Sequence, residues 1–155
     1  SISAQWLNGG TTIWRQDVLK EFSHEVINSN WAISEDLIFS YPIGKKYPLY
    51  VCEEAKVLHD HILSPSADLS LHRVRGESWA LWHLYFVQKN RDLSLASYIL
   101  MVFLMVSIGL LVGVFGRKGK KLSSFFRGIG RGAVMGIGAI SKKEDIKSLL
   151  ENINI

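Results

Sequence analysis

The chain has 155 residues, a net charge of +4 and a pI near 9.2. Its single cysteine, Cys52, excludes an internal disulfide and a cysteine-based metal framework, and we expect it to be a small buried residue. The charge is unevenly distributed: residues 1–92 carry nine Lys or Arg and eleven Asp or Glu, a net −2, whereas residues 117–155 carry nine and three, a net +6.

Residues 1–76 are predicted to form a small, mainly helical domain. Thr11 or Thr12 is a candidate cap for a first helix, and Ser34 for a second helix that ends near Phe39, where two proline-containing turns follow. A third helix is predicted over residues 49–63, and Asp68 is a candidate cap for the next one. The first and third helices have apolar residues about one turn apart: Trp14, Val18, Phe22 and Val26, then Val51, Ala55, Leu58 and Ile62.

Two histidines are candidate metal ligands. His59 and His61, near Glu53 and Glu54, are positioned to hold a metal if that stretch is extended. The stretch has a helical pattern, however, and residues two apart on a helix point in different directions. We therefore predict surface histidines and no metal or other cofactor.

Residues 93–116 are 24 consecutive uncharged residues. At a rise of about 1.5 Å per residue, a helix of this length crosses a hydrocarbon core of roughly 30 Å, and we predict a transmembrane helix here. Residues 77–92 precede it as an aromatic juxtamembrane segment, in one continuous helix from about Glu77 to Gly116. Trp and Tyr favour the water–lipid boundary, which assigns four residues of this segment to the membrane interface: Trp79, Trp82, Tyr85 and Phe86. The alternative is that they pack on the outer domain.

The basic residues that follow predict the orientation of this helix. Positive charges near a span stay on the cytoplasmic side, so residues 117–155 are predicted to be a cytoplasmic tail of a bacterial or organellar inner-membrane protein. Residues 1–92 are then outside, and we expect their export to need a signal peptide or an upstream span. Six basic residues carry this topology signal: Arg117, Lys118, Lys120, Lys121, Arg127 and Arg131. The alternative is that they bind anionic lipid, with Phe125 and Phe126 in the membrane interface.

Glycines recur every four residues in two places, Gly109 and Gly113 within the span and Gly128, Gly132 and Gly136 after it. Such spacing makes a flat helix face that a second helix can approach closely, so we predict helix packing at these positions. For the second series a flexible loop is the alternative, because each glycine disfavours a helix by about 1 kcal/mol. Ser141 and Glu144 have the spacing of a capping box and predict a final short amphipathic helix.

The predicted fold is mainly α: a single-span membrane protein with a small helical extracytoplasmic domain and a short basic tail. No Cys-x-x-Cys-His, phosphate-binding loop or Gly-x-Ser-x-Gly motif is present, and no acid–base pair stands out, so we predict that it is not an enzyme. The predicted role is a non-catalytic structural or accessory subunit of a membrane complex, such as a secretion, conjugation or energy-transducing assembly. Its partners are other membrane subunits and the lipid bilayer, or a second copy of the chain, but not nucleic acid. The alternatives are a receptor or regulator that signals through helix dimerisation, and a membrane-active lytic protein.

Overall fold

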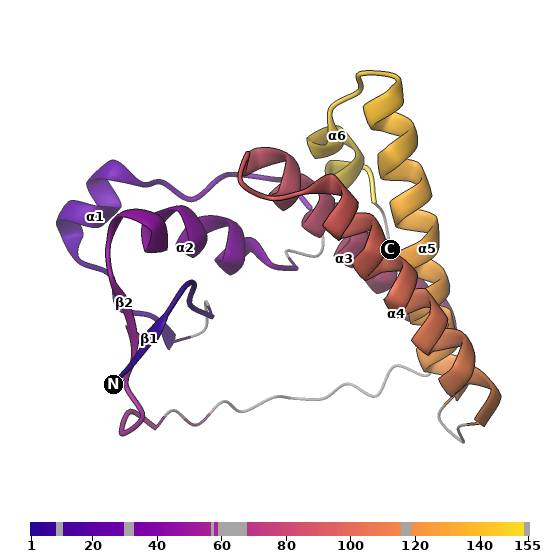
Figure 1. The fold of residues 1–155 in the computed structure, drawn as a ribbon, viewed down its shortest axis with the longest axis horizontal. Coiled ribbons are helices and arrows are strands. Elements are labelled where there is room, and N and C mark those ends of the chain that lie inside the picture. Colours follow the sequence, from indigo (N-terminus) through magenta and orange to yellow (C-terminus); the bar gives the residue numbers. More distant parts are fainter. Residues whose placement is uncertain (9–10, 30–32, 57, 59–67, 116–118, 154–155) are drawn as a thin grey trace. The chain divides into compact units, whose positions relative to one another are not determined.

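The computed structural model describes residues 1–8, 11–29, 33–56, 58, 68–115 and 119–153, and over 112–115 it describes the helix alone. These residues form two compact units, which we name the N-terminal unit (residues 1–26 and 34–65) and the bundle unit (residues 27–33 and 66–155). The elements follow one another as β1 (Ile2–Ala4), α1 (Gln16–Glu21), α2 (Glu35–Lys46), β2 (Leu49–Val51), α3 (Leu69–Lys89), α4 (Leu95–Phe115), α5 (Gly119–Ser141) and α6 (Ile146–Glu151) (Figure 1). The fold is mainly helical.

The N-terminal unit is built on a small apolar core. β1 and β2 pair antiparallel, with Ala4 opposite Leu49. Val18 of α1, Phe39 and Ile43 of α2, and Leu49 are buried together. The ring of Trp14 meets Phe39 edge-on, with centroids 5.3 Å apart. Burial of these side chains from four segments holds the short elements together.

Three predictions for the N-terminal unit are wrong. The first helix is not capped by Thr11 or Thr12, because α1 begins at Gln16 after Arg15. It ends at Glu21, before Phe22 and Val26. The helix expected over residues 49–63 begins instead as strand β2, because residues 49–51 pair with β1; residues 59–63 lie outside the described chain. The second helix does not stop near Phe39 but runs to Lys46, with Pro42 inside it. Phe39 and Ile43 lie one turn apart on its buried side, and their burial outweighs the hydrogen bond that proline removes.

The bundle unit begins with α3, which is capped by Asp68 as predicted: the Asp68 carboxylate accepts a 2.8 Å hydrogen bond from the Ser70 amide. The single helix predicted from Glu77 to Gly116 is wrong, because α3 ends at Lys89 and α4 begins at Leu95. The Asn90 side chain donates to the Phe86 carbonyl, 2.8 Å away, and the Leu93 amide donates to the Asn90 carbonyl, 2.9 Å away. These bonds compete with helical ones and turn the chain.

The last two helices complete the bundle unit. The glycine-rich stretch is helical throughout and lies within α5. The final helix is present, but its cap is Asp145, which accepts a 2.9 Å bond from the Lys147 amide. Ser141 is instead the last residue of α5. Ile146, Leu150 and Ile153 are buried, as expected for the apolar side of an amphipathic helix.

The predicted membrane-spanning helix is corrected by the structure. Within the described residues, no helix combines the length and apolar character that crossing a membrane requires. The uncharged stretch forms α4, which packs against α3 and α5. The single-span fold and the inner-membrane location inferred from this stretch are therefore not supported. Absence of charge does not by itself indicate contact with lipid, since packing within a helix bundle also favours uncharged residues.

Candidate functional site

Glycines bring α3 and α5 into close contact. A Cβ atom on Gly128 would lie 2.0 Å from the Arg73 carbonyl oxygen, and one on Gly132 would lie 2.6 Å from the Glu77 carbonyl oxygen. From the other side, a Cβ on Gly76 would lie 2.0 Å from the Phe125 carbonyl oxygen. Such distances leave no room for any side chain, so the two backbones touch along this surface. Packing at this distance offsets the low helix propensity of the glycines in α5.

The remaining glycines of the predicted packing series contact side chains. A Cβ on Gly136 would lie 2.3 Å from Leu84 Cδ2, and one on Gly109 would lie 2.2 Å from Cγ of Phe126. Gly109 of α4 thus accommodates an aromatic ring of α5, which is itself buried. The surroundings of Gly113 lie outside the described side chains.

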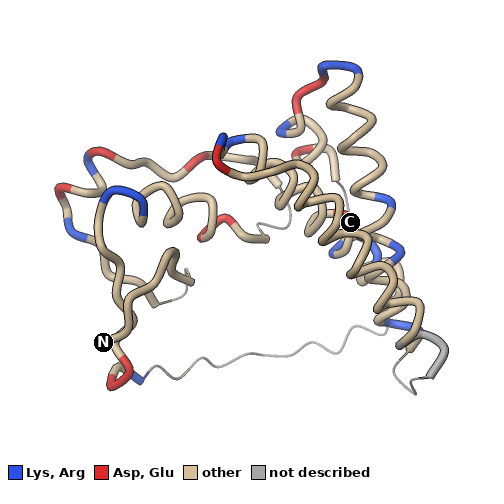
Figure 2. Tube along the Cα trace, viewed as in Figure 1, with Lys and Arg blue, Asp and Glu red and all other residues tan. Residues whose placement is uncertain are grey.

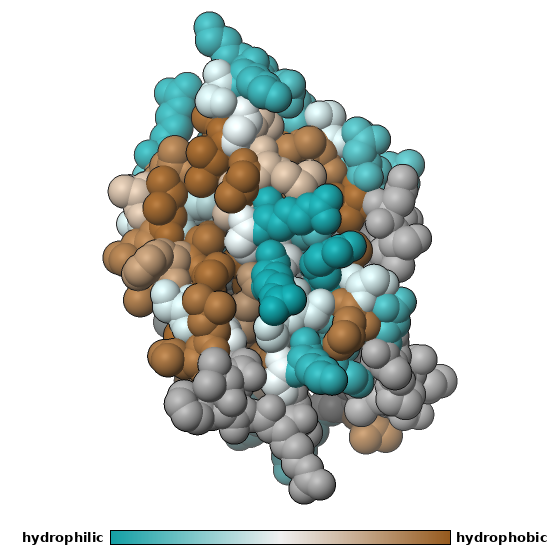
Figure 3. Space-filling model, turned by 90° about the vertical axis from the view of Figure 1, so that its right-hand side faces the viewer, coloured by the Kyte–Doolittle hydropathy of each residue, from teal (hydrophilic) through white to brown (hydrophobic). Residues whose placement is uncertain are grey.

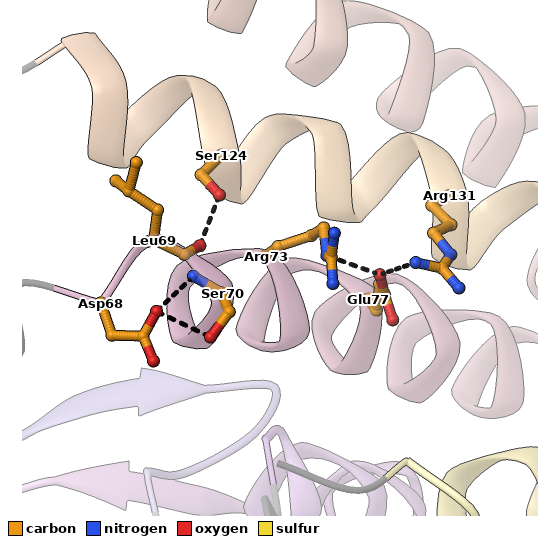
Figure 4. A network of polar contacts seen from close by, with 7 residues as sticks. All are labelled: Asp68, Leu69, Ser70, Arg73, Glu77, Ser124 and Arg131. Carbon is orange, nitrogen blue, oxygen red and sulfur yellow. Dashed lines mark hydrogen bonds and ion pairs between the residues drawn. The ribbon is translucent and has the colours of Figure 1, made fainter.

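A buried carboxylate lies at the α3–α5 contact. Glu77 is 7% exposed, and its Oε1 is 3.4 Å from Nη1 of Arg131 and 3.6 Å from Nε of Arg73. Figure 4 shows Glu77 between the two guanidinium groups, one from its own helix and one from α5. A carboxylate taken out of water needs compensating charge, and the two arginines supply it. The arrangement is a structural clamp between two helices.

The side chains predicted at a membrane interface belong to the bundle packing. Trp82, Phe86 and Phe126 are buried, whereas Trp79, Tyr85 and Phe125 are partly buried. A membrane-interface role requires a spanning helix after residue 92, and no such helix is found in the described chain. These rings are buried, wholly or in part, by packing within the bundle unit.

Tyr98 anchors α4 to α3. It is 2% exposed, and its hydroxyl donates a 3.1 Å hydrogen bond to the Ala80 carbonyl oxygen. Tyr98 and Gly109 are eleven residues apart, which at about 100° per residue places them on the same side of α4. This side is the one that meets the rest of the bundle.

The opposite side of α4 is apolar and open to solvent. The small Ala96 and Ser97 are exposed beside its large exposed side chains, which are 40–65% accessible: Leu95, Ile99, Leu100, Phe103, Leu104, Ile108, Leu110 and Leu111. We call these eight residues the α4 face. Figure 2 shows no charged residue along α4, and Figure 3 shows apolar side chains gathered beside a band of hydrophilic ones. The α4 face is the most prominent candidate interaction surface of the described chain.

The predicted basic cluster is divided by the structure. Lys120 and Arg127 line an open cavity, Arg131 pairs with Glu77, and Lys121 lies exposed on α5. Arg117 and Lys118 lie outside the described residues.

No metal-binding cluster is found among the described side chains. They contain no group of three or more His, Cys, Asp or Glu that is arranged to hold a metal ion. His59 and His61 lie outside the described part of the chain. Cys52 is exposed, contrary to the expectation of a buried residue.

Sequence reasoning did not single out Gly76, Arg73, Glu77 or Tyr98 as packing residues. Gly76 is an isolated glycine, and its importance follows only from the glycines it faces in α5. Tyr98 could have been found from the sequence, because a tyrosine hydroxyl in an apolar helix needs a hydrogen-bond partner when it is buried.

Comparison of the chain with known protein families, with characterised proteins and with solved structures finds no match.

Proposed function

We propose that the protein is a non-catalytic subunit of a larger protein assembly, which it joins through the α4 face. The observation that supports this role is the size of that face. With each of its eight side chains about half exposed, it presents apolar surface on the order of 800 Å², more than the roughly 300–600 Å² of the largest patch on a typical monomer. It is comparable to the area of roughly 800 Å² that each partner contributes to a stable complex.

The lack of charge on the α4 face indicates the kind of surface that a partner must present. Because α4 carries no charged residue, the matching surface must be apolar at its centre and needs no salt bridges to the face. The exposed positions follow the helix over four turns, from Leu95 to Leu111. A helix of a different protein, presenting its own apolar side, matches such a surface.

Two charge substitutions test this role. Phe103 and Leu110 are each 65% exposed, so Phe103→Glu and Leu110→Glu place a charge in the interface without filling the bundle core. The control is Ile13→Glu, which changes an apolar residue that is 97% exposed in the N-terminal unit. Each tagged full-length chain is purified from its native cells in detergent-free buffer, and co-purifying proteins are quantified by mass spectrometry.

We expect a stoichiometric partner that is retained by the wild type and by Ile13→Glu, and lost from both α4 variants. Circular dichroism should show the same helix content in all four proteins. A partner retained equally by all four, or a wild type that purifies alone, contradicts the proposal. Recovery as a homodimer that the α4 variants dissociate also contradicts it, and favours a regulator that dimerises through this helix.

A further inference from the structure

An open cavity of about 690 Å³ lies between the first turns of α3 and the first turns of α5. Leu69, Ser70 and Arg73 of α3 line it together with five residues of α5, namely Gly119, Lys120, Ser123, Ser124 and Arg127. We call it the basic groove. Spacings of three and four residues place the α5 set on one side of that helix, facing α3. The volume lies within the range of roughly 300–1,000 Å³ found for small-molecule sites.

The groove carries positive charge that the described chain does not neutralise. Three of its eight residues are basic and none is acidic. Arg73 pairs with Glu77 at 3.6 Å, so the positive charge left in the groove comes from Lys120 and Arg127. The nearest acidic residue before α3, Asp68, accepts bonds from Ser70 and points away from α5 in Figure 4.

The hydroxyl groups of the groove have different roles. The Ser124 hydroxyl donates to the Leu69 carbonyl, 2.6 Å away, and the Ser70 hydroxyl donates to Asp68, 2.7 Å away, so both fix the walls. Ser123 remains as a hydroxyl donor toward the cavity.

We propose that the basic groove binds the phosphate group of a small soluble phosphate monoester. One guanidinium group, one ammonium group and a hydroxyl match the charge and the several acceptor oxygens of a phosphate dianion. The lining has no aromatic side chain on which a base would stack, which favours a phosphate ester over a nucleic acid. The space exceeds that of a bare ion and accommodates a small organic group beside the phosphate.

Titration calorimetry on the full chain tests this site. The probes are inorganic phosphate and glycerol phosphate in a low-salt buffer, against chloride at matched ionic strength. The groove variants are Lys120→Gln and Arg127→Gln. The control is Lys142→Gln, which removes the same charge from the exposed turn that follows α5. Circular dichroism verifies that all variants keep the wild-type helix content.

Each probe should bind the wild type and the Lys142→Gln variant with the same affinity. Each groove variant should bind about tenfold more weakly, since each loses a charge-assisted hydrogen bond. No binding above the chloride reference, or an equal loss in all three variants, overturns the proposal. Binding only to vesicles that carry the same phosphate monoester on phosphatidic acid, and not to glycerol phosphate, also overturns it.

Discussion

Tyr98 is the buried polar contact through which α4 is held on α3. Its hydroxyl donates to the Ala80 carbonyl oxygen, and desolvation by burial raises the pKa of Tyr98 above its usual value of 10.0. The unfolded chain therefore loses this proton at lower pH than the folded chain does. The contribution of Tyr98 to stability is fully present below about pH 10 and is lost as the pH rises further.

Replacing Tyr98 with Phe should lower the free energy of unfolding by about 1 kcal/mol at neutral pH, because one buried hydrogen bond is lost. Above pH 10 the difference should shrink, since only the wild type must keep a buried phenol protonated. Urea unfolding followed by circular dichroism, at pH 7 and at pH 10.5, measures both differences. A difference that does not change with pH contradicts this account of the hydroxyl.

His83 is expected to make the stability of the bundle unit depend on pH below neutrality. Its Nδ1 donates to the Trp79 carbonyl oxygen, 2.8 Å away, and its ring lies on the Trp79 ring. Desolvation by burial lowers the pKa of His83 below 6.5, although the bond to Trp79 acts in the opposite direction. The stability that neutral His83 contributes is present above pH 6.5 and is lost as the pH falls below it.

We expect His83→Gln to lose less stability than the wild type between pH 7 and pH 5, because glutamine does not titrate there. Thermal unfolding at a series of pH values compares the two proteins. If the unfolding temperatures of both proteins change equally with pH, His83 is accessible to protons in the folded bundle.

The contact between α3 and α5 depends on the absence of side chains. Gly128→Ala should lower the free energy of unfolding by about 2 kcal/mol or more, because its Cβ would meet the Arg73 carbonyl and force the helices apart. Gly138 of the same helix is the matched control, with nothing within 4 Å of a Cβ there. Gly138→Ala should be neutral or stabilise the chain by about 0.5 kcal/mol, because alanine favours the helix.

Urea unfolding at neutral pH measures both changes. Destabilisation of similar size at the two positions would mean that helix propensity, and not the close contact, sets the outcome. A neutral Gly128→Ala would mean that α3 and α5 do not approach as closely as the structure shows.

Local patterns predicted some elements but not their partners. The cap at Asp68 and the apolar side of α6 depend on neighbouring residues, and both were predicted from the sequence. The Gly128 series was predicted to pack against a helix, yet nothing in its spacing identified α3 as that helix, or Gly76 as the facing glycine. Those are contacts between residues about 50 positions apart, and only the folded chain brings them together.

Elements whose form depends on distant residues were predicted wrongly. Residues 49–51 have a helical apolar pattern but pair with β1, some 45 positions earlier. The lack of charge in α4 was read as contact with lipid, although Tyr98 and Gly109 place one side of it on other helices. The same absence of charge makes the exposed side of α4 apolar. The residues that form the α4 face are determined by the contacts that bury the opposite side of the helix.

At the scale of the whole molecule, the two units have separate cores. Ile43 is 1% exposed in the N-terminal unit, and Leu81 is fully buried in the bundle unit. Either residue changed to Ala should cost about 2–5 kcal/mol through the cavity it leaves. We expect each substitution to act mainly on the unit that contains it.

Hydrogen exchange followed by mass spectrometry resolves this effect by segment. Ile43→Ala should speed exchange in α2 and leave α3 and α5 protected, whereas Leu81→Ala should do the reverse. Loss of protection in both units for either variant would show that the units unfold together, as one cooperative structure.

The central claim is that the α4 face contacts another protein. The most direct measurement places a photo-crosslinking amino acid at Phe103 of the full chain in its native cells, with the same group at Ile13 as the control. We predict one crosslinked product of constant mass at Phe103, containing a different protein, and none at Ile13. No product at Phe103, or the same mixture of products at both positions, would contradict the claim.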